Sequence, residues 1–333
     1  MTGRNSRLRA ALIGIGHDHA WGKVQALRRS EDMDLVGAFE PDASEWSRQQ
    51  ARGFFTDVPS MSEIDVLNDE TIQVVFVETL PRDNLRWARR VLEHGKHLHL
   101  DKAPSPSLNS LRDVLRLAGD RNLHVQLGYQ FRYNPGVELA LRAMREGWLG
   151  NVTRINVDIP TDIGGYSTVR LKDGAHAGAM FYLLGCHVLD ATVLFLGEPS
   201  SVWASHRRDA RGQGDPFEDN CTAVLQYPGA IAVLQTWITG NDPIGHRRFQ
   251  VIGERGSVLI EPIEPPGLRL YFDEAHQEFP SGWSEPEIPM RPRYDGDIAD
   301  LATWIRGEHA PAYTADHDLA VHQTLLRICS VID

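Results

Sequence analysis

The sequence is poor in cysteine and has no long apolar run. Its three cysteines, Cys186, Cys221 and Cys329, are an odd number without a C-x-x-C pair, which fits small core residues in a reducing compartment. No stretch approaches the roughly 20 apolar residues that a membrane span needs. The apolar run behind the polar N-terminus, Ala10–Ile15, is too short for a secretory signal peptide. These absences predict a cytoplasmic protein that does not enter a membrane.

Basic residues are outnumbered by acidic ones. The chain has 34 Lys and Arg against 45 Asp and Glu, a formal net charge of −11. Such a surface repels phosphate backbones, so we expect no nucleic acid partner, although a local basic pocket could still hold a small anion. The sequence shows no internal repeat and no low-complexity tract. Its length of 333 residues predicts two domains.

The first 128 residues alternate between short apolar runs and amphipathic stretches. Short, mostly apolar strands separated by helices require right-handed crossovers and a parallel sheet that is covered on both faces. We therefore expect an α/β domain over residues 1–128, a Rossmann-type doubly wound parallel sheet. The expected strands are 8–15, 35–39, 72–77, 97–100 and 124–127, and the expected helices are 19–29, 44–53, 82–94 and 107–121.

The pattern changes after Gly128. A strand is expected at 152–159, and antiparallel strands are expected at 201–208, 220–227, 230–238, 247–252 and 257–260. Helices are expected at 137–146, 178–196, 294–306 and 316–331. Tyr227–Ala230 and Gly253–Gly256 have the composition of hairpin turns, whereas 261–266 and 280–292 read as loops. Residues 129–333 are thus predicted to form an α+β domain with a large open, mainly antiparallel sheet.

A glycine turn between the first strand and the first helix is the first candidate site. Gly14 permits a tight turn, and Gly16 lets the backbone approach a pyrophosphate at a helix N-terminus. His17 and Asp18 follow, and His19 occupies the position of the third glycine in a G-x-G-x-x-G fingerprint. The alternative is a glycine-rich turn that binds nothing.

Glu40 ends the second expected strand, 24 residues after Gly16. A carboxylate there accepts hydrogen bonds from the hydroxyls of an adenosine ribose and repels a 2′-phosphate. The sequence therefore favours NAD(H) over NADP(H), with Thr79 and Asp101 as further cofactor-side candidates. The alternative for Glu40 is a solvated acid at the end of a strand.

The consecutive residues His17, Asp18 and His19 also suggest a metal site. Two imidazoles and a carboxylate can coordinate zinc, but three consecutive residues rarely converge on one ion, and the sequence identifies no further ligand. The simpler interpretation is that Asp18 caps the helix while the histidines line the loop. No metal is therefore expected.

The segment Gly95–Pro104, which reads G-K-H-L-H-L-D-K-A-P, places Lys102 just after a buried strand. It resembles the G-K-H-x-x-x-E-K-P signature of the glucose-fructose oxidoreductase/inositol dehydrogenase (Gfo/Idh/MocA) family, with Asp101 for the usual glutamate and Ala103 inserted. The resemblance implies that Lys102 contacts both the nicotinamide and the substrate hydroxyl. Asn84 stands where the family often has a histidine.

A second motif of the same family, a helix carrying D-x-G-x-H, is matched at Gly178–His187. The resemblance makes His187 the catalytic histidine, which accepts the hydroxyl proton while Lys102 stabilises the developing alkoxide. Leu183 replaces the aspartate that would orient this imidazole. Asp190 or Tyr182 could substitute for it, because both are near His187 on the helix.

The resemblance covers residues 8–330 and implies an NAD-dependent dehydrogenase that acts on a secondary hydroxyl of a sugar, inositol or related polyol. One alternative, favoured by Leu183, is a catalytically weak nucleotide- or sugar-sensing protein; another is an NAD-dependent glycosidase. Exposed apolar strands such as Ile231–Ile238 need covering, so we expect a homodimer or homotetramer formed through the C-terminal sheet. The substrate-side candidates are Tyr129, Arg132, Tyr133, Arg170, Tyr182 and Asp190.

Overall fold

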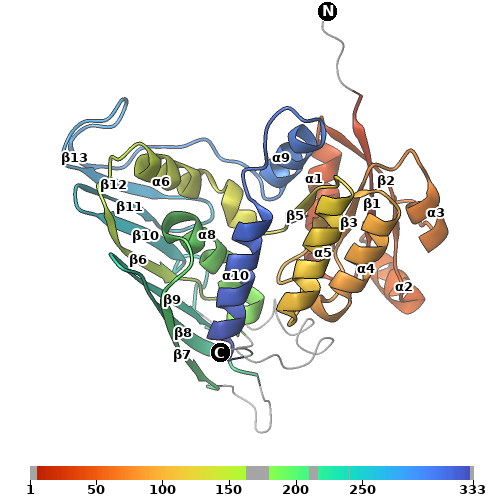
Figure 1. Ribbon diagram of the computed structural model, residues 1–333, viewed down its shortest axis with the longest axis horizontal. Helices are drawn as coiled ribbons and strands as arrows, with labels where there is room; N and C mark the ends of the chain where they lie inside the picture. Colours follow the sequence, from red (N-terminus) through yellow and green to blue (C-terminus); the bar gives the residue numbers. More distant parts are fainter. Residues whose placement is uncertain (1–5, 163–179, 210–216, 240, 331–333) are drawn as a thin grey trace, which may run out of the picture. The chain divides into compact units, whose positions relative to one another are not determined.

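The computed structural model describes residues 6–162, 180–209, 217–239 and 241–330. The chain divides into two compact units (Figure 1). The first combines residues 1–128 with 292–315, and the second combines 129–291 with 316–333. The sequence placed 292–315 with the second domain, whereas the structure places this segment in the first unit.

The first unit contains a five-stranded parallel sheet with the strand order β2-β1-β3-β4-β5. This is the doubly wound α/β sheet that the sequence predicts. Its strands are β1 (Leu8–Ile13), β2 (Met33–Phe39), β3 (Val74–Val77), β4 (His97–Leu100) and β5 (Val125–Leu127). Its helices are α1 (Asp18–Arg29), α2 (Ala43–Ala51), α3 (Glu63–Asn68), α4 (Pro81–Glu93), α5 (Leu108–Asp120) and α9 (Asp295–Ile305).

Helices cover both faces of the parallel sheet (Figure 1). Helices α4 and α5 pack together on one face, while α1 and α9 share a core with the other face. Ile298, Leu301 and Ala302 of α9 are buried in that core. This explains the departure from the expected domain boundary: α9 returns to the first unit because its apolar stripe is buried there, which composition along the chain cannot reveal.

The second unit contains an eight-stranded sheet with the order β13-β12-β11-β10-β6-β9-β8-β7, antiparallel except for β6 against β9. Its strands are β6 (Val152–Asp158), β7 (Ser201–Arg207), β8 (Asn220–Gln226), β9 (Ile231–Trp237), β10 (Arg248–Gly253), β11 (Gly256–Ile260), β12 (Leu268–Phe272) and β13 (Gly282–Ser284). Its helices are the 3-10 turn η1 (Gln130–Tyr133), α6 (Pro135–Arg145), the π-helical turn η2 (Phe181–Gly185), α8 (Cys186–Leu196) and α10 (Ala315–Ile328).

Both predicted hairpins of this sheet are present. Strands β8 and β9 are joined at Tyr227, whose N–H donates to the Ala230 carbonyl at 2.9 Å. Strands β10 and β11 are joined after Gly253. The expected loop 280–292 is wrong in one part, because β13 pairs there with β12 and sets Trp283 opposite Tyr271. A three-residue strand is too short to show the alternation by which strands are found in a sequence.

The two faces of the large sheet differ in exposure. Helices α6 and α8 pack against one face (Figure 1), and the inward side chains of β8 and β9 alternate with partly exposed ones. The other face leaves Trp203 at 60% exposure. Among the described residues, no helix combines the length and the apolar character that crossing a membrane would require.

Candidate functional site

The glycine turn follows β1 and is held by its own sheet. Gly14 has φ +90°, and its N–H donates to the Phe39 carbonyl at 2.8 Å. A Cβ at this position would lie 2.6 Å from the Thr79 methyl carbon. A glycine is therefore required both by the left-handed backbone and by the close approach to the end of β3. Helix α1 begins four residues later, at Asp18.

Glu40 lies where the sequence places it, directly after β2. One carboxylate oxygen accepts the Ile15 N–H at 2.7 Å, and the other accepts the Asp42 N–H at 2.9 Å. Burial raises the pKa of Glu40, and these two backbone donors oppose that rise. Glu40 thus contacts the glycine turn itself, which is the position from which it could meet a ribose.

Glu45 of α2 is an acidic group at the turn that the sequence did not single out. A Cβ on Gly16 would lie 3.1 Å from Glu45 Cγ. The Glu45 side chain is buried and contacts Arg48 at 2.7 Å and the Gln49 amide at 2.7 Å. Gly16 therefore lets a carboxylate that is paired with Arg48 approach the loop, beside the path expected for a pyrophosphate.

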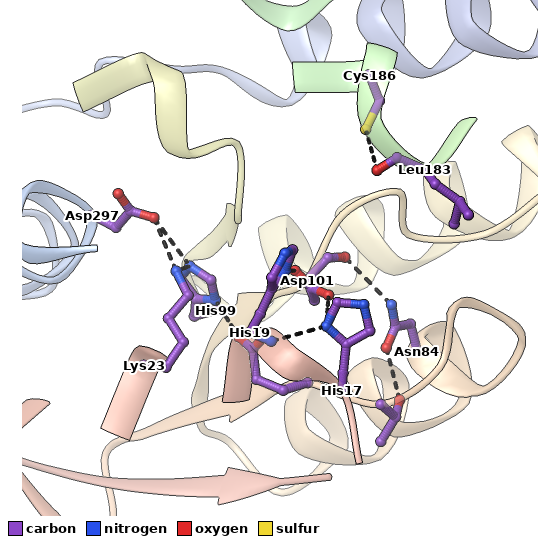
Figure 2. A network of polar contacts seen from close by, with 11 residues as sticks. His17, His19, Lys23, Asn84, His99, Asp101, Leu183, Cys186 and Asp297 are labelled. Carbon is purple, nitrogen blue, oxygen red and sulfur yellow. Dashed lines mark hydrogen bonds and ion pairs between the residues drawn. The ribbon is translucent and has the colours of Figure 1, made fainter. Parts of the chain in front are cut away.

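His17 and His19 point toward Asp101, the residue after β4 (Figure 2). His19 Nδ1 is 2.9 Å from one Asp101 oxygen, and His17 Nδ1 is 3.5 Å from the other. Burial lowers the pKa of His17 to about 4 and also lowers that of His19. Burial alone would raise the pKa of Asp101, but His19 and His17 outweigh it and hold that pKa below its usual range.

A second polar network lies in the same unit (Figure 2). The Lys23 ammonium donates to Asp297 at 3.0 Å and to His99 Nε2 at 2.9 Å, and it lies 4.1 Å from the centre of the Tyr294 ring. Because Nε2 accepts, the proton of a neutral His99 is on Nδ1, which lies 3.4 Å from Glu78. None of these residues was singled out from the sequence. Of these residues, only Glu78 could have been selected from the sequence as a candidate site residue, because it directly follows a buried strand.

Lys102, the candidate for hydride-transfer chemistry, follows β4 and is 5% exposed. Its charge acts on both His17 and Asp101. Nearby, the Thr79 hydroxyl donates to the Asn84 side chain at 2.7 Å, and Asn84 donates to the Asp101 carbonyl at 3.4 Å. The cofactor-side candidates Gly14, Thr79 and Asp101 are thus brought together at the carboxyl edge of the parallel sheet.

In the second unit, His187 is the second residue of α8 and is 2% exposed. Its ring is edge-on to Tyr129 at 6.2 Å between centroids and tilted against Phe131 at 5.5 Å. The turn before it, which contains Tyr182 and Leu183, is π-helical and not α-helical. Such turns are frequent at functional sites, and this one changes the angular relation between Leu183 and His187 that α-helical spacing assumes.

Arg132 and Asp190, two of the substrate-side candidates, are buried and paired with each other. The guanidinium of Arg132 contacts Asp190 at 2.7 Å and Asp318 at 2.5 Å. Asp190 also lies 2.9 Å from His317 Nε2. Both Asp190 oxygens take part in this cluster, whose contacts join η1, α8 and α10.

The remaining substrate-side candidates have different positions. Tyr129 and Tyr182 are fully buried, and Tyr133 accepts a hydrogen bond from Arg291 at its carbonyl, at 3.1 Å. Arg170 lies outside the described residues. Burial raises the pKa of Tyr129 well above its usual value, so this phenol stays protonated near neutral pH.

Comparison with known families decides the relationship. Residues 8–129 match the model of an oxidoreductase family with an NAD-binding Rossmann fold, and residues 137–259 match the GFO/IDH/MocA C-terminal domain. The chain belongs to the Gfo/Idh/MocA family. The resemblance inferred from its motifs is thereby confirmed, and the family makes it an oxidoreductase with an NAD(P)-binding domain.

Relatives in the Gfo/Idh/MocA family are distant. The uncharacterized oxidoreductase YhhX of Escherichia coli is 26% identical over 260 residues, which cover 77% of this chain and 72% of that protein. The scyllo-inositol 2-dehydrogenase (NADP(+)) IolW of Bacillus subtilis is 21% identical over 70% of this chain and 64% of its own length. An oxidoreductase from Agrobacterium radiobacter, solved with NAD+, L-tartaric acid and magnesium, superposes with a TM-score of 0.78 at 14% identity, over 96% of this chain and 94% of that one.

The residues at the glycine turn fit a dinucleotide. The positive φ of Gly14, the N-terminus of α1 and the carboxylate of Glu40 supply the turn, the donor end and the ribose acceptor that such a cofactor needs. Glu45 also lies beside this turn, and its ion pair with Arg48 at 2.7 Å offsets its charge. NAD(P) bound here would supply the hydride acceptor, while the protein's own groups bind, orient and move the proton.

Proposed function

We propose that this protein transfers a hydride between NAD(H) and a secondary hydroxyl of a sugar, an inositol or a related polyol. The observation that carries the proposal is the position of Glu40, whose carboxylate contacts the glycine turn at 2.7 Å. The bound NAD+ of the Agrobacterium radiobacter structure and the inositol named for IolW support the cofactor and the substrate class.

A preference for NAD(H) over NADP(H) is part of this proposal. Glu40 and Glu45 both bring carboxylates to the turn, and a 2′-phosphate would add charge of the same sign. IolW carries NADP(+) in its name, so the preference is argued from these two residues and not from relatives.

Lys102 and His187 are proposed as the groups that act on the substrate. The Lys102 ammonium would hydrogen-bond the reacting oxygen, and His187 would accept its proton. Leu183 gives the second candidate function, a regulator that binds the nucleotide without turnover, because a leucine cannot stabilise the imidazolium of His187.

Calorimetric titration with NADH and NADPH, followed by a polyol panel assayed for cofactor reduction, tests the proposal. Tighter binding of NADH together with turnover is the expected result. Binding without turnover on any polyol would support the regulator, and release of an aglycone without net cofactor reduction would support a glycosidase. Absence of binding by either dinucleotide would contradict all three.

We also propose that the open face of the large sheet joins two copies of the chain. Trp203, Val224 and Val233 occupy neighbouring positions on three strands, and Trp203 and Trp283 are 60% and 58% exposed. Apolar side chains in such a row are expected to be covered by a partner surface. A homodimer or homotetramer satisfies this requirement.

A cytoplasmic location completes the proposal. Cys186, Cys221 and Cys329 are buried thiols that form no disulfide, and burial raises the pKa of Cys221 to about 12. Such thiols suit a reducing compartment. Fractionation of producing cells would test the proposal. The protein is expected in the cytoplasmic fraction, and its recovery outside that fraction would contradict the proposal.

A further inference from the structure

Two imidazoles and a carboxylate converge on one point of the first unit (Figure 2). One ligand atom from each of His17, His19 and Asp101 lies within 4.8 Å of the other two. The two His–Asp contacts measure 2.9 and 3.5 Å. A tetrahedral zinc ion with bonds of about 2.0–2.1 Å spaces its ligand atoms about 3.3 Å apart. The observed spacings lie on either side of this value.

The hydrogen bonds at His17 leave an unfavourable contact that a cation would relieve. His17 Nδ1 accepts the His19 N–H at 3.2 Å, so this atom presents a lone pair and not a proton. It therefore faces the Asp101 oxygen as one acceptor facing another across 3.5 Å. Two acceptors at this distance repel each other unless a proton or a metal ion lies between them. If His17 Nδ1 coordinated a metal ion, it would lose the 3.2 Å hydrogen bond from the His19 N–H and gain a bond to the metal.

The charges around the cluster do not prevent a cation from binding. The negative charge of Glu78 acts on His17 and Asp101 in the opposite direction to the positive charge of Lys102. Lys23 is neutralised by Asp297 at 3.0 Å. Asp101 is only 1% exposed to solvent. Solvent therefore screens the attraction between its carboxylate and a cation only slightly.

A second group of similar composition is less suited to a metal. Asp190, His317 and Asp318 also bring ligand atoms within 4.8 Å of one another. Their two carboxylates already hold the Arg132 guanidinium at 2.7 and 2.5 Å. This buried cation supplies the positive charge that a metal would bring, and it would repel one.

We infer that His17, His19 and Asp101 bind one divalent first-row transition ion of the zinc class. Two imidazole nitrogens select such an ion over Mg²⁺ or Ca²⁺, which prefer oxygen ligands. Three protein ligands leave a fourth position for water or for an oxygen of a bound small molecule, as in open zinc sites. The site lies wholly within the first unit, next to the glycine turn where the dinucleotide is proposed to bind, so zinc binding is tested on the coenzyme-free protein.

Calorimetric titration of the chelator-treated, coenzyme-free protein with ZnCl₂ tests the inference. One equivalent is expected to bind per chain, and Co²⁺ in its place is expected to give the visible absorption of a site with nitrogen and oxygen ligands. The variants His19→Ala and Asp101→Asn should each lose about 100-fold or more in zinc affinity, at least as much as loss of an outer-sphere partner costs. His317→Ala, which alters the second group, should bind as the wild type does.

Circular dichroism and thermal melting show whether each variant is folded. If Asp101→Asn does not fold, His19→Gln provides the same test at a partly exposed side chain. Absence of stoichiometric zinc binding by the wild type would overturn the inference, as would unchanged affinity in a folded His19 variant or loss of binding only in His317→Ala. NADH titration in the presence of chelator keeps this result separate from the proposed function.

Discussion

Lys23 and Asp297, which are 274 positions apart in the sequence, form an ion pair of 3.0 Å in which both side chains are almost completely buried. Lys23 belongs to α1 and Asp297 to α9, so the ion pair links α9 to the rest of the first unit. The charge interactions with Lys23 and His99 keep the pKa of Asp297 below its usual range, although burial acts in the opposite direction. The carboxylate is therefore ionised at neutral pH.

The first prediction concerns the stability that depends on this pair. Asp297→Leu leaves the Lys23 ammonium buried without its carboxylate, and losing one partner of a buried pair typically costs about 3–5 kcal/mol. We expect a decrease of that size in the free energy of unfolding, measured by denaturant titration. The double variant Lys23→Met/Asp297→Leu should recover most of the loss. Equal destabilisation of the single and double variants would contradict the prediction.

The second prediction concerns the choice of dinucleotide. Glu40→Gln keeps an oxygen that can accept the Ile15 N–H but removes the negative charge that would repel a 2′-phosphate. The ratio of the Kd for NADPH to the Kd for NADH should fall by about 10-fold, equivalent to ~1.4 kcal/mol. Calorimetry measures both constants. Asp34→Asn, at the other end of β2, is the control and should leave the ratio unchanged.

The third prediction is a loss of stability in acid that depends on His97. Its Nδ1 accepts the His124 N–H at 3.1 Å, and burial, aided by His124, lowers its pKa from 6.5 to about 4. The unfolded chain takes up a proton at this residue below about pH 6.5, whereas the folded protein does so only near pH 4. This contribution is therefore present above pH 6.5 and is lost as the pH falls toward 4.

Denaturant titrations at several pH values measure this effect. In His97→Gln, the free energy of unfolding should fall less steeply with decreasing pH than in the wild type. The exposed residue His94 provides the matched control, and His94→Gln should keep the wild-type slope. Identical slopes in all three proteins would show that His97 does not contribute.

The fourth prediction concerns association through the large sheet. Trp203→Glu places a charge among Val224 and its neighbours on the open face, and burying it in an interface would be unfavourable. Light scattering should show a wild-type dimer or tetramer and a smaller species for the variant. Ile64→Glu changes a side chain of 69% exposure in the first unit and should not alter the mass. A monomeric wild type would contradict the proposed interface.

The parallel sheet could be predicted from the sequence because its strands are short and mostly apolar and are separated by helical patterns. Glu40 and Gly14 could be placed for the same reason, since the ends of such strands meet at one edge. Helix α9 could not be assigned to the first unit, because its burial depends on Leu27 and other residues far away in the sequence.

The polar clusters also could not be predicted from local sequence patterns. The sequence suggested that His17 and His19 lacked a further ligand, whereas β4 brings Asp101 to 2.9 Å from His19. The buried ion pair between Arg132 and Asp190 was not predicted either. In each case the deciding partner lies on another element, at a separation that spacing rules for one helix or strand do not cover.

The most direct test of the proposed dehydrogenase is the Lys102→Ala variant, assayed for NAD+ reduction on the polyol that the wild type oxidises. Removing the ammonium should lower kcat by about 100-fold or more, as is typical when a group acting on the reacting oxygen is lost. The Kd for NADH should change much less. Full turnover by the folded variant would contradict the role of Lys102, and a wild type that neither binds NADH nor reduces NAD+ would contradict the dehydrogenase itself.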